Sequence, residues 1–167
     1  EGIAVLNGTS AMTGIGAINL VHAYSLINWS VIFSTMINEL VEAFDDHFSD
    51  ELNSLKPHPG QRKIAAAMKK IAGKSKLIKK RHEILYQSKN IEKQDIVKEK
   101  VQEYYSLRCV PQILGPIYDT IRYAEGVVMS EVNSVNDNPV IDAVAQDVFH
   151  GGNFHGDYVA LEMDKLR

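Results

Sequence analysis

Residues 102–112 carry the side chains of this chain that are best suited to bind and transform a small substrate. Gln102, Tyr105 and Arg108 are spaced three residues apart, so one helical turn would present an amide, a phenol and a guanidinium on one face. A guanidinium can bind a carboxylate through two parallel hydrogen bonds, and a phenol can transfer a proton if its pKa is lowered. Spacing alone favours an ordinary polar helix face over a site, by roughly four to one.

Four segments, including this run, resemble the signature sequences of one enzyme family and occur in the family's order. Residues 102–108 match the pattern Gln-x-x-Tyr-Ser-x-Arg. Residues 1–9 are similar to Glu-Gly-Leu-Ala-Leu-x-Asn-Gly-Thr, residues 133–139 to Asn-Ser-x-x-Asp-Asn-Pro, and residues 151–156 to Gly-Gly-Asn-Phe-His/Gln-Gly. The chain therefore resembles the histidine, phenylalanine and tyrosine ammonia-lyases, which build a 4-methylidene-imidazol-5-one (MIO) group from their own backbone.

The resemblance implies a role for five side chains. Asn7 and Gln102 are expected to hydrogen-bond the MIO group or the substrate beside it. Arg108 is expected to bind the substrate carboxylate, with Tyr105 next to the reacting amino acid. Phe154 is expected to pack against the MIO ring. Simpler structural roles exist for each, since Asn7 can satisfy the backbone of a turn and Phe154 can be ordinary core.

The parts of the family's active site that make the electrophile are expected outside this chain. No Ala-Ser-Gly triplet occurs in the sequence, and in the family that triplet lies upstream and cyclises to form MIO. The family's catalytic-base tyrosine and a later glutamate also lie outside this range. Since the chain begins without methionine and ends in a helix-compatible run, we expect an internal fragment that is inactive alone.

The resemblance implies non-oxidative elimination of ammonia from histidine or tyrosine, giving urocanate or coumarate. Gln-Glu-Tyr-Tyr at residues 102–105 and Gly-Asn-Phe-His-Gly at residues 152–156 lean toward a bacterial tyrosine-type enzyme. An aromatic 2,3-aminomutase would look the same over this range, and a non-catalytic helical assembly module is the remaining alternative. The family forms homotetramers whose active sites are shared among three subunits.

The expected fold is mainly helical, part of a long-helix bundle of the ammonia-lyase (fumarase/aspartase-like) type that is incomplete in this chain. Residues 11–44 contain only two charged side chains, Glu39 and Glu42, and no proline. Apolar residues occupy all faces at helical spacing, which predicts a helix buried on every side. Such a helix would be about 50 Å long, so it requires packing partners from outside the chain.

A membrane span is the rival interpretation of this apolar stretch. Unpaired polar groups in lipid cost several kcal/mol each, and polar side chains recur along the stretch. We therefore expect a soluble bundle and no membrane. These polar residues are Asn19, His22, Asn28 and Asn38.

The remaining chain predicts further helices separated by polar connections, all within one central helical lyase domain over residues 1–167. A helix over residues 61–72 should end at Gly73, and a polar, Lys-rich excursion should follow at about 74–100. Apolar residues at steps of three and four predict a long helix after Pro111.

The long helix after Pro111 should end at a polar turn over residues 133–139. Residues 140–149 alternate weakly, as in a short strand or an extended arm. Glycines 151 and 152 permit positive φ, and a new helix should begin near His155.

Charge and cysteine content exclude several other functions. Residues 56–100 carry fourteen Lys and Arg against four acids, a charge pattern found in nucleic-acid-binding proteins. A solvated insertion is favoured instead, because aromatic residues, which would stack on bases, are nearly absent from this segment. The sequence contains one cysteine, Cys109, so a disulfide framework is excluded. We expect Cys109 to be a buried packing residue. His150, His155 and Asp157 fit no standard zinc spacing, so we expect no metal. The sequence has no signal-peptide pattern, and we expect a cytoplasmic protein.

Overall fold

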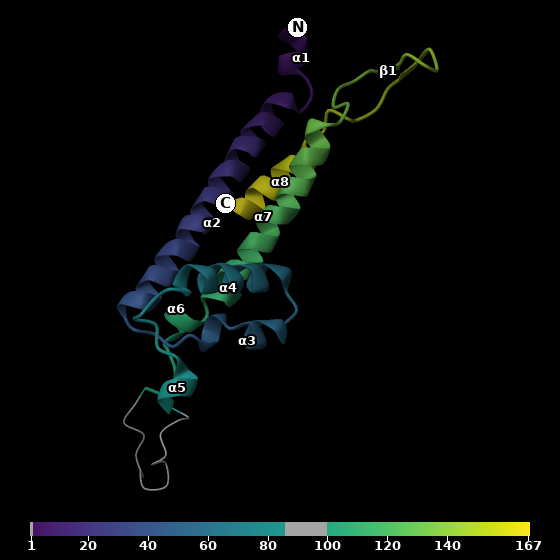
Figure 1. The fold of residues 1–167 in the computed structure, drawn as a ribbon. Helices are drawn as coiled ribbons and strands as arrows, with labels where there is room; N and C mark the ends of the chain where they lie inside the picture. Colours follow the sequence, from purple (N-terminus) through teal and green to yellow (C-terminus); the bar gives the residue numbers. More distant parts are fainter. Residues whose placement is uncertain (1, 86–99) are drawn as a thin grey trace. The chain divides into compact units, whose positions relative to one another are not determined.

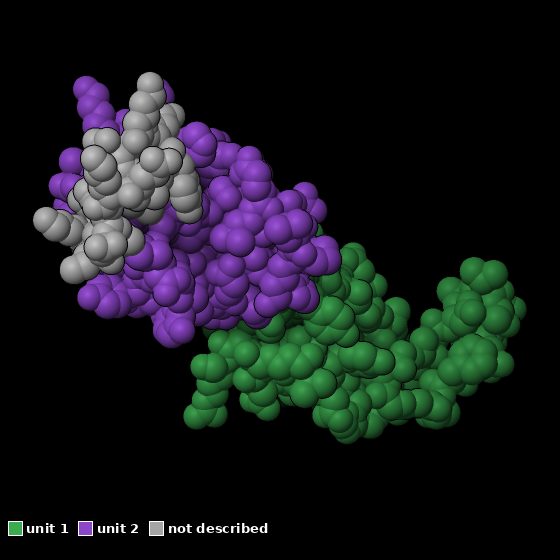
Figure 2. Space-filling view, turned by 90° about the horizontal axis from the view of Figure 1, so that it is seen from below, with its two compact units in different colours: residues 1–25, 120–167 green, residues 26–119 purple. Residues whose placement is uncertain are grey.

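The structure is a computed structural model that describes residues 2–85 and 100–167 (Figure 1). Glu1, in the first family-like segment, and residues 86–99 of the Lys-rich excursion lie outside the described residues. The chain divides into two compact units, residues 1–25 with 120–167 (unit 1) and residues 26–119 (unit 2), coloured separately in Figure 2. The elements are α1 (Gly2–Leu6), α2 (Ser10–Leu40), η1 (Asp46–Phe48), α3 (Asp50–Ser54), α4 (Pro59–Ala72), α5 (Arg81–Leu85), α6 (Tyr105–Arg108), α7 (Val110–Val132), β1 (Val140–Asp142), β2 (Asp147–Phe149) and α8 (Asp157–Leu166).

Helix α2 confirms the predicted long apolar helix but ends earlier than expected. The backbone N–H of Ala43 donates to the carbonyl of Asn38 at 2.9 Å, and that of Glu42 donates to the carbonyl of Glu39 at 3.0 Å. This pair of bonds is a Schellman motif, in which the residue after the helix cap adopts a left-handed conformation. Glu42 has φ 51°, so the chain reverses there and cannot remain helical to residue 44.

Much of the α2 surface is apolar and exposed in this chain. Within this chain α2 is therefore not buried on every side, as expected of a helix that requires packing partners from outside the chain. By length and composition α2 could cross a membrane, although core helices of soluble proteins satisfy the same criterion. The exposed apolar residues of α2 are Ile15, Ile18, Val21, Leu26, Trp29, Phe33, Met36, Ile37 and Leu40.

Unit 1 is held together where α2, α7 and α8 meet. A Cβ atom added to Gly16 would lie 3.2 Å from Cγ1 of Val159 and 3.8 Å from Cγ2 of Val128, so the three helices approach closely at this glycine. Val128 and Val159 are fully buried. The hydroxyl of Tyr24 on α2 donates to the carboxylate of Glu125 on α7 at 2.7 Å. The predicted helices after Pro111 and near His155 are confirmed as α7 and α8.

A β-hairpin follows α7 in unit 1. Strands β1 and β2 pair antiparallel, with Val140 opposite Phe149. The carboxylate of Asp142 accepts hydrogen bonds from the backbone N–H groups of Val144 at 2.8 Å and Ala145 at 3.0 Å, and these bonds lower the pKa of Asp142. The extended segment predicted at 140–149 is therefore confirmed, as two short strands joined by an Asp-stabilised turn.

Unit 2 depends on a close crossing of α4 and α7. A Cβ atom on Gly60 would lie 2.2 Å from the carbonyl oxygen of Gly115, and a Cβ on Gly115 would lie 2.6 Å from the backbone nitrogen of Gln61. The buried side chain of Gln61 donates to Oδ1 of Asn53 at 3.0 Å, which ties α4 to α3. Helix α4 confirms the predicted helix and ends at its cap residue, Gly73.

Two glycines of α7 provide a matched test of this crossing. Gly115→Ala forces a methyl group against the backbone of α4, and we expect it to cost about 1–3 kcal/mol of stability. Gly126→Ala places the same methyl group in open space, where replacing a helical glycine gains about 0.5–1 kcal/mol. Thermal melting of the complete protein should show a lower transition for Gly115→Ala alone. Equal transitions for both variants would contradict the close crossing.

Candidate active site

The three side chains predicted to form a site in unit 2 come together, although not on one helix. Gln102 precedes α6, so the expectation of a single helical turn is wrong for this residue. Its side-chain oxygen nevertheless accepts a hydrogen bond from Nη1 of Arg108. The Arg108 guanidinium carbon lies 4.6 Å from the centre of the Tyr105 ring, which is a cation–π distance. An amide, a phenol and a guanidinium therefore form one cluster.

The segment that carries this cluster is held in place by Glu103. The Glu103 side chain is buried, with 3% of the residue exposed. One carboxylate oxygen accepts a hydrogen bond from the backbone N–H of Phe44 at 3.0 Å, and the other forms an ion pair with Lys100. Since Phe44 directly follows the turn that ends α2, this contact fixes the cluster relative to the end of that helix.

Arg81 makes a second set of contacts between the same two parts of the chain. Its guanidinium donates to the backbone carbonyl of Val101 and, through Nε, to the carboxylate of Asp46 at 2.8 Å. The guanidinium carbon also lies 4.2 Å from the centre of the Phe44 ring. Only 14% of the Arg81 side chain is exposed, although sequence analysis describes its segment as solvated.

A cavity of about 440 Å³ lies beside the cluster, within the size range of small-molecule sites. Gln102 and Arg108 both contribute to its wall. Cys109, expected to be buried packing, also lines the cavity and is half-buried. The lining residues are Asp46, His47, Leu52, Arg81, Val101, Gln102, Glu103, Arg108, Cys109 and Gln112.

His47 is a buried titratable group in the wall of this cavity that sequence analysis did not identify. It is 4% exposed, and within residues 2–85 and 100–167 neither ring nitrogen has a hydrogen-bond partner. Burial lowers the pKa of His47 from its ordinary value of 6.5, because a charged imidazolium is poorly solvated there; Asp46, Glu103 and Asp45 oppose this shift. Burial therefore favours the neutral form of the His47 imidazole.

The lowered pKa of His47 predicts a pH-dependent stability. As the pH falls below 6.5, the unfolded chain takes up a proton at this position before the folded chain does, so stability is lost on acidification toward the folded pKa. His47→Asn removes this titration. Melting temperatures of the complete protein should therefore converge for wild type and variant between about pH 7.5 and about pH 5.5. Parallel curves of melting temperature against pH would show that burial of the His47 imidazole contributes nothing to the pH dependence of stability.

In unit 1 the loop that carries Asn7 is fixed by its two neighbours. Gly8 has φ 71°, and an added Cβ would lie 2.3 Å from the carbonyl oxygen of Asn136. Thr9 is buried, and its hydroxyl donates to the carboxylate of Glu131. Positive φ thus occurs at Gly8, whereas glycines 151 and 152, which would permit it, do not adopt it.

Three of the four family-like segments meet in unit 1. The N–H of Gly151 donates to the side-chain oxygen of Asn138 at 2.9 Å, and the side chain of Asn153 donates to the carbonyl of Val135 at 3.1 Å. A Cβ on Gly156 would lie 3.6 Å from Cγ2 of Thr9. Residues 7–9, 133–139 and 151–156 therefore form one cluster of loops.

Two of the predicted site residues belong to this cluster of loops. The Asn7 side chain is exposed, and the Phe154 side chain is half-exposed in the same unit. The other three predicted residues, those around Arg108, belong to unit 2. The five predicted residues therefore fall into two groups, one in each unit.

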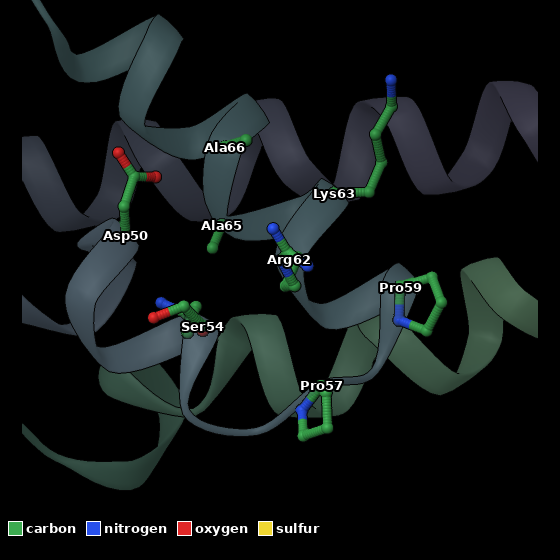
Figure 3. Close-up of a pocket in the computed structure, with 9 residues that line it drawn as sticks. Asp50, Ser54, Pro57, Pro59, Arg62, Lys63, Ala65 and Ala66 are labelled. Atoms are coloured by element: carbon green, nitrogen blue, oxygen red, sulfur yellow. The ribbon is translucent and has the colours of Figure 1, made fainter.

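Other candidate sites have less support. A hollow of about 460 Å³ is lined by residues of α3, α4 and the loop between them, and none of the predicted residues lines it. Figure 3 shows Asp50, Arg62 and Lys63 around it, with Pro57 and Pro59. His155 Nδ1 lies 3.3 Å from the carboxylate of Asp157. Within the described part of the chain, no three His, Cys, Asp or Glu residues are grouped as metal ligands.

Comparison with known proteins identifies the family. The sequence profile of the family described as "Aromatic amino acid lyase" matches residues 1–167. The chain is 42% identical to a probable histidine ammonia-lyase of Thermoplasma volcanium over 99% of its own length, and 39% identical to a tyrosine 2,3-aminomutase of Myxococcus fulvus over 99%. The structure of a phenylalanine aminomutase from Pantoea agglomerans matches 99% of the chain with a TM-score of 0.89 and 36% identity.

This chain belongs to the aromatic amino acid lyase family. The resemblance of the four sequence segments and the expectation of a mainly helical lyase fold are both confirmed. The chain spans about a third of the length of these relatives: 30% of the Thermoplasma protein, 32% of the Myxococcus protein and 33% of the Pantoea structure.

Proposed function

We propose that the complete protein is an aromatic amino-acid ammonia-lyase that eliminates ammonia from histidine or tyrosine without oxidation. The observation that carries the proposal is the cluster of Gln102, Tyr105 and Arg108 beside a cavity of about 440 Å³. Membership of the family and relatives named as histidine ammonia-lyase and tyrosine ammonia-lyase support it.

In this proposal Arg108 binds the carboxylate of the amino acid. Arginine presents a rigid planar fork of donors that matches both carboxylate oxygens. The contacts with Gln102 and the Tyr105 ring hold the guanidinium in one orientation. A carboxylate fixed in this way orients the Cα–Cβ bond for removal of a β-proton, and the entropic part of the barrier falls. Tyr105 and Gln102 then lie next to the reacting atoms and stabilise developing charge.

The family implies an MIO group, formed from an Ala-Ser-Gly triplet elsewhere in the polypeptide. When bound, that group supplies an electrophile that makes the amine a better leaving group. The Asn7 amide is an exposed donor suited to a carbonyl oxygen, and Phe154 offers a half-exposed aromatic face suited to a flat ring. Both residues therefore fit the group and would hold it. No metal is part of the proposal.

A 2,3-aminomutase is the second candidate. Tyrosine 2,3-aminomutases from two Myxococcus strains are 39% and 38% identical to this chain, so relatives with this activity are as similar as the ammonia-lyases. Such an enzyme begins with the same elimination and then adds ammonia at the β-carbon. The residues of this chain act identically in both reactions.

We further propose that the complete protein is a cytoplasmic homotetramer with shared active sites. The exposed apolar surface of α2, including Trp29 and Phe33, needs a cover, and other helices of the polypeptide and of sister subunits provide one. This cover makes a membrane unnecessary. A non-catalytic assembly module would bury α2 in the same manner but would lack the clustered Gln102, Tyr105 and Arg108.

The direct test is an assay of the complete protein with histidine, tyrosine and phenylalanine. We expect urocanate, coumarate or cinnamate to form, with release of ammonia, and ultraviolet absorbance follows all three products. Chromatography for β-amino acids separates a lyase from an aminomutase. Absence of both product types with all three substrates would exclude the proposed activity.

Arg108 variants test the assigned carboxylate contact. We expect Arg108→Ala to raise KM about 10- to 100-fold for every accepted amino acid, because a hydrogen bond to a charged group contributes about 1.5–3 kcal/mol. Arg108→Lys keeps the positive charge but not the paired hydrogen bonds, so its KM should lie between those of the wild type and Arg108→Ala. Arg122→Ala, on the exposed surface of α7, is the matched control. Unaltered KM in Arg108→Ala would remove this role.

A further inference from the structure

We propose that Glu103 is a positioning residue for carboxylate binding, because it fixes the backbone from which Gln102 and Arg108 extend. The inference rests on the proposed function. Glu103 borders the cavity but is only 3% exposed, and its carboxylate faces Phe44 and Lys100. It acts through the segment that it anchors to Phe44.

The burial of Glu103 makes its position well defined. A carboxylate that is 3% exposed must keep its partners, since an unpaired buried charge is strongly destabilising. Its two oxygens engage the backbone N–H of Phe44 and the ammonium of Lys100. The backbone N–H cannot move away without disturbing the turn after α2. Oε1 is therefore satisfied by a hydrogen bond, whereas Oε2 has the Lys100 ion pair and, among the described residues, no hydrogen bond.

The path from Glu103 to Arg108 is short and stiff. The carbonyl of the next residue, Tyr104, accepts hydrogen bonds from the N–H groups of Leu107 and Arg108, both at 3.0 Å. Tyr104 thus caps helix α6, which begins two residues after Glu103, and any shift of Glu103 rotates the whole turn. On the other side Gln102 is covalently adjacent and bonds the Arg108 guanidinium. The contacts of Glu103 therefore fix the backbone positions of both Gln102 and Arg108.

Two cations, Arg81 and Lys100, also hold the segment that Glu103 anchors. Arg81 fixes the carbonyl of Val101, two residues before Glu103, and also contacts the Phe44 ring. Lys100 lies 5.9 Å from the Tyr104 ring centre in addition to its ion pair. Residues 100–104 are therefore held by several contacts, of which Glu103 makes the one that is deeply buried.

The test uses the complete protein and compares two ligands. One is the accepted amino acid, and the other is the amine with the same side chain but no carboxylate: histamine, tyramine or 2-phenylethylamine. The ratio of the amine's inhibition constant to the amino acid's KM reports carboxylate recognition. Glu103→Ala should lower this ratio about ten- to hundredfold, because a displacement of about 1 Å can cost about a hundredfold.

Variants separate positioning from a purely structural role. Glu103→Gln keeps an oxygen for the Phe44 N–H and should retain a ratio closer to wild type. Glu83→Gln, an exposed ion-paired glutamate of α5 in the same unit, is the matched control and should leave the ratio unchanged. If Glu103→Ala does not fold, Glu103→Asp, which shortens the side chain by one methylene, should lower the ratio instead.

A Glu103→Ala or Glu103→Asp enzyme with a lower melting temperature but a wild-type ratio would overturn the inference. An equal fall of the ratio in Glu103→Gln and Glu103→Ala would also overturn the inference. The oxygen that Glu103→Gln retains for the Phe44 N–H would then make no difference to carboxylate recognition. Failure of the proposed function is distinguishable, since it appears as a wild-type protein without activity, before any variant is compared.

Discussion

The arrangement of the candidate site depends on one buried carboxylate. Glu103 accepts the backbone N–H of Phe44 at 3.0 Å, and these residues are separated by 59 positions in the sequence. Without this contact the segment that carries Arg108 would be joined to the end of α2 mainly through Arg81. Because an unpaired buried charge is so costly, the contact holds the cluster in one geometry, with Gln102 and Arg108 in the wall of a cavity.

The elements with strong local signals are the ones that the sequence predicts well. The apolar periodicity before the 133–139 turn defines α7, and Gly73 marks the end of α4. The end of α2 was not predictable, because its left-handed cap residue is Glu42, where glycine is the usual signal. The packing partners of α2 were not predictable either. Its apolar composition shows that the helix must be covered, but not which helices cover it.

The candidate site was predicted only in part, for a physical reason. The family-like segments identify Asn7, Gln102, Tyr105, Arg108 and Phe154, because chemistry constrains residue type at fixed positions. Arg81 and His47 have no such pattern. Their importance comes from contacts with residues far away in the sequence, and a Lys-rich segment gives no indication that the side chain of one of its cations is only 14% exposed. An acid next to Gln102 and inside the same family-like segment, as at residue 103, is the one local sign that could have been noticed.

The most direct test of the account is an experimental structure of the complete protein with its unsaturated acid product bound. The account predicts that both oxygens of the product's carboxylate lie within hydrogen-bonding distance of the Arg108 guanidinium, about 2.7–2.9 Å away. It also predicts that Glu103 still accepts the N–H of Phe44 in that state. A product whose carboxylate is bound by a different cation, with Arg108 turned toward solvent, would contradict the assignment.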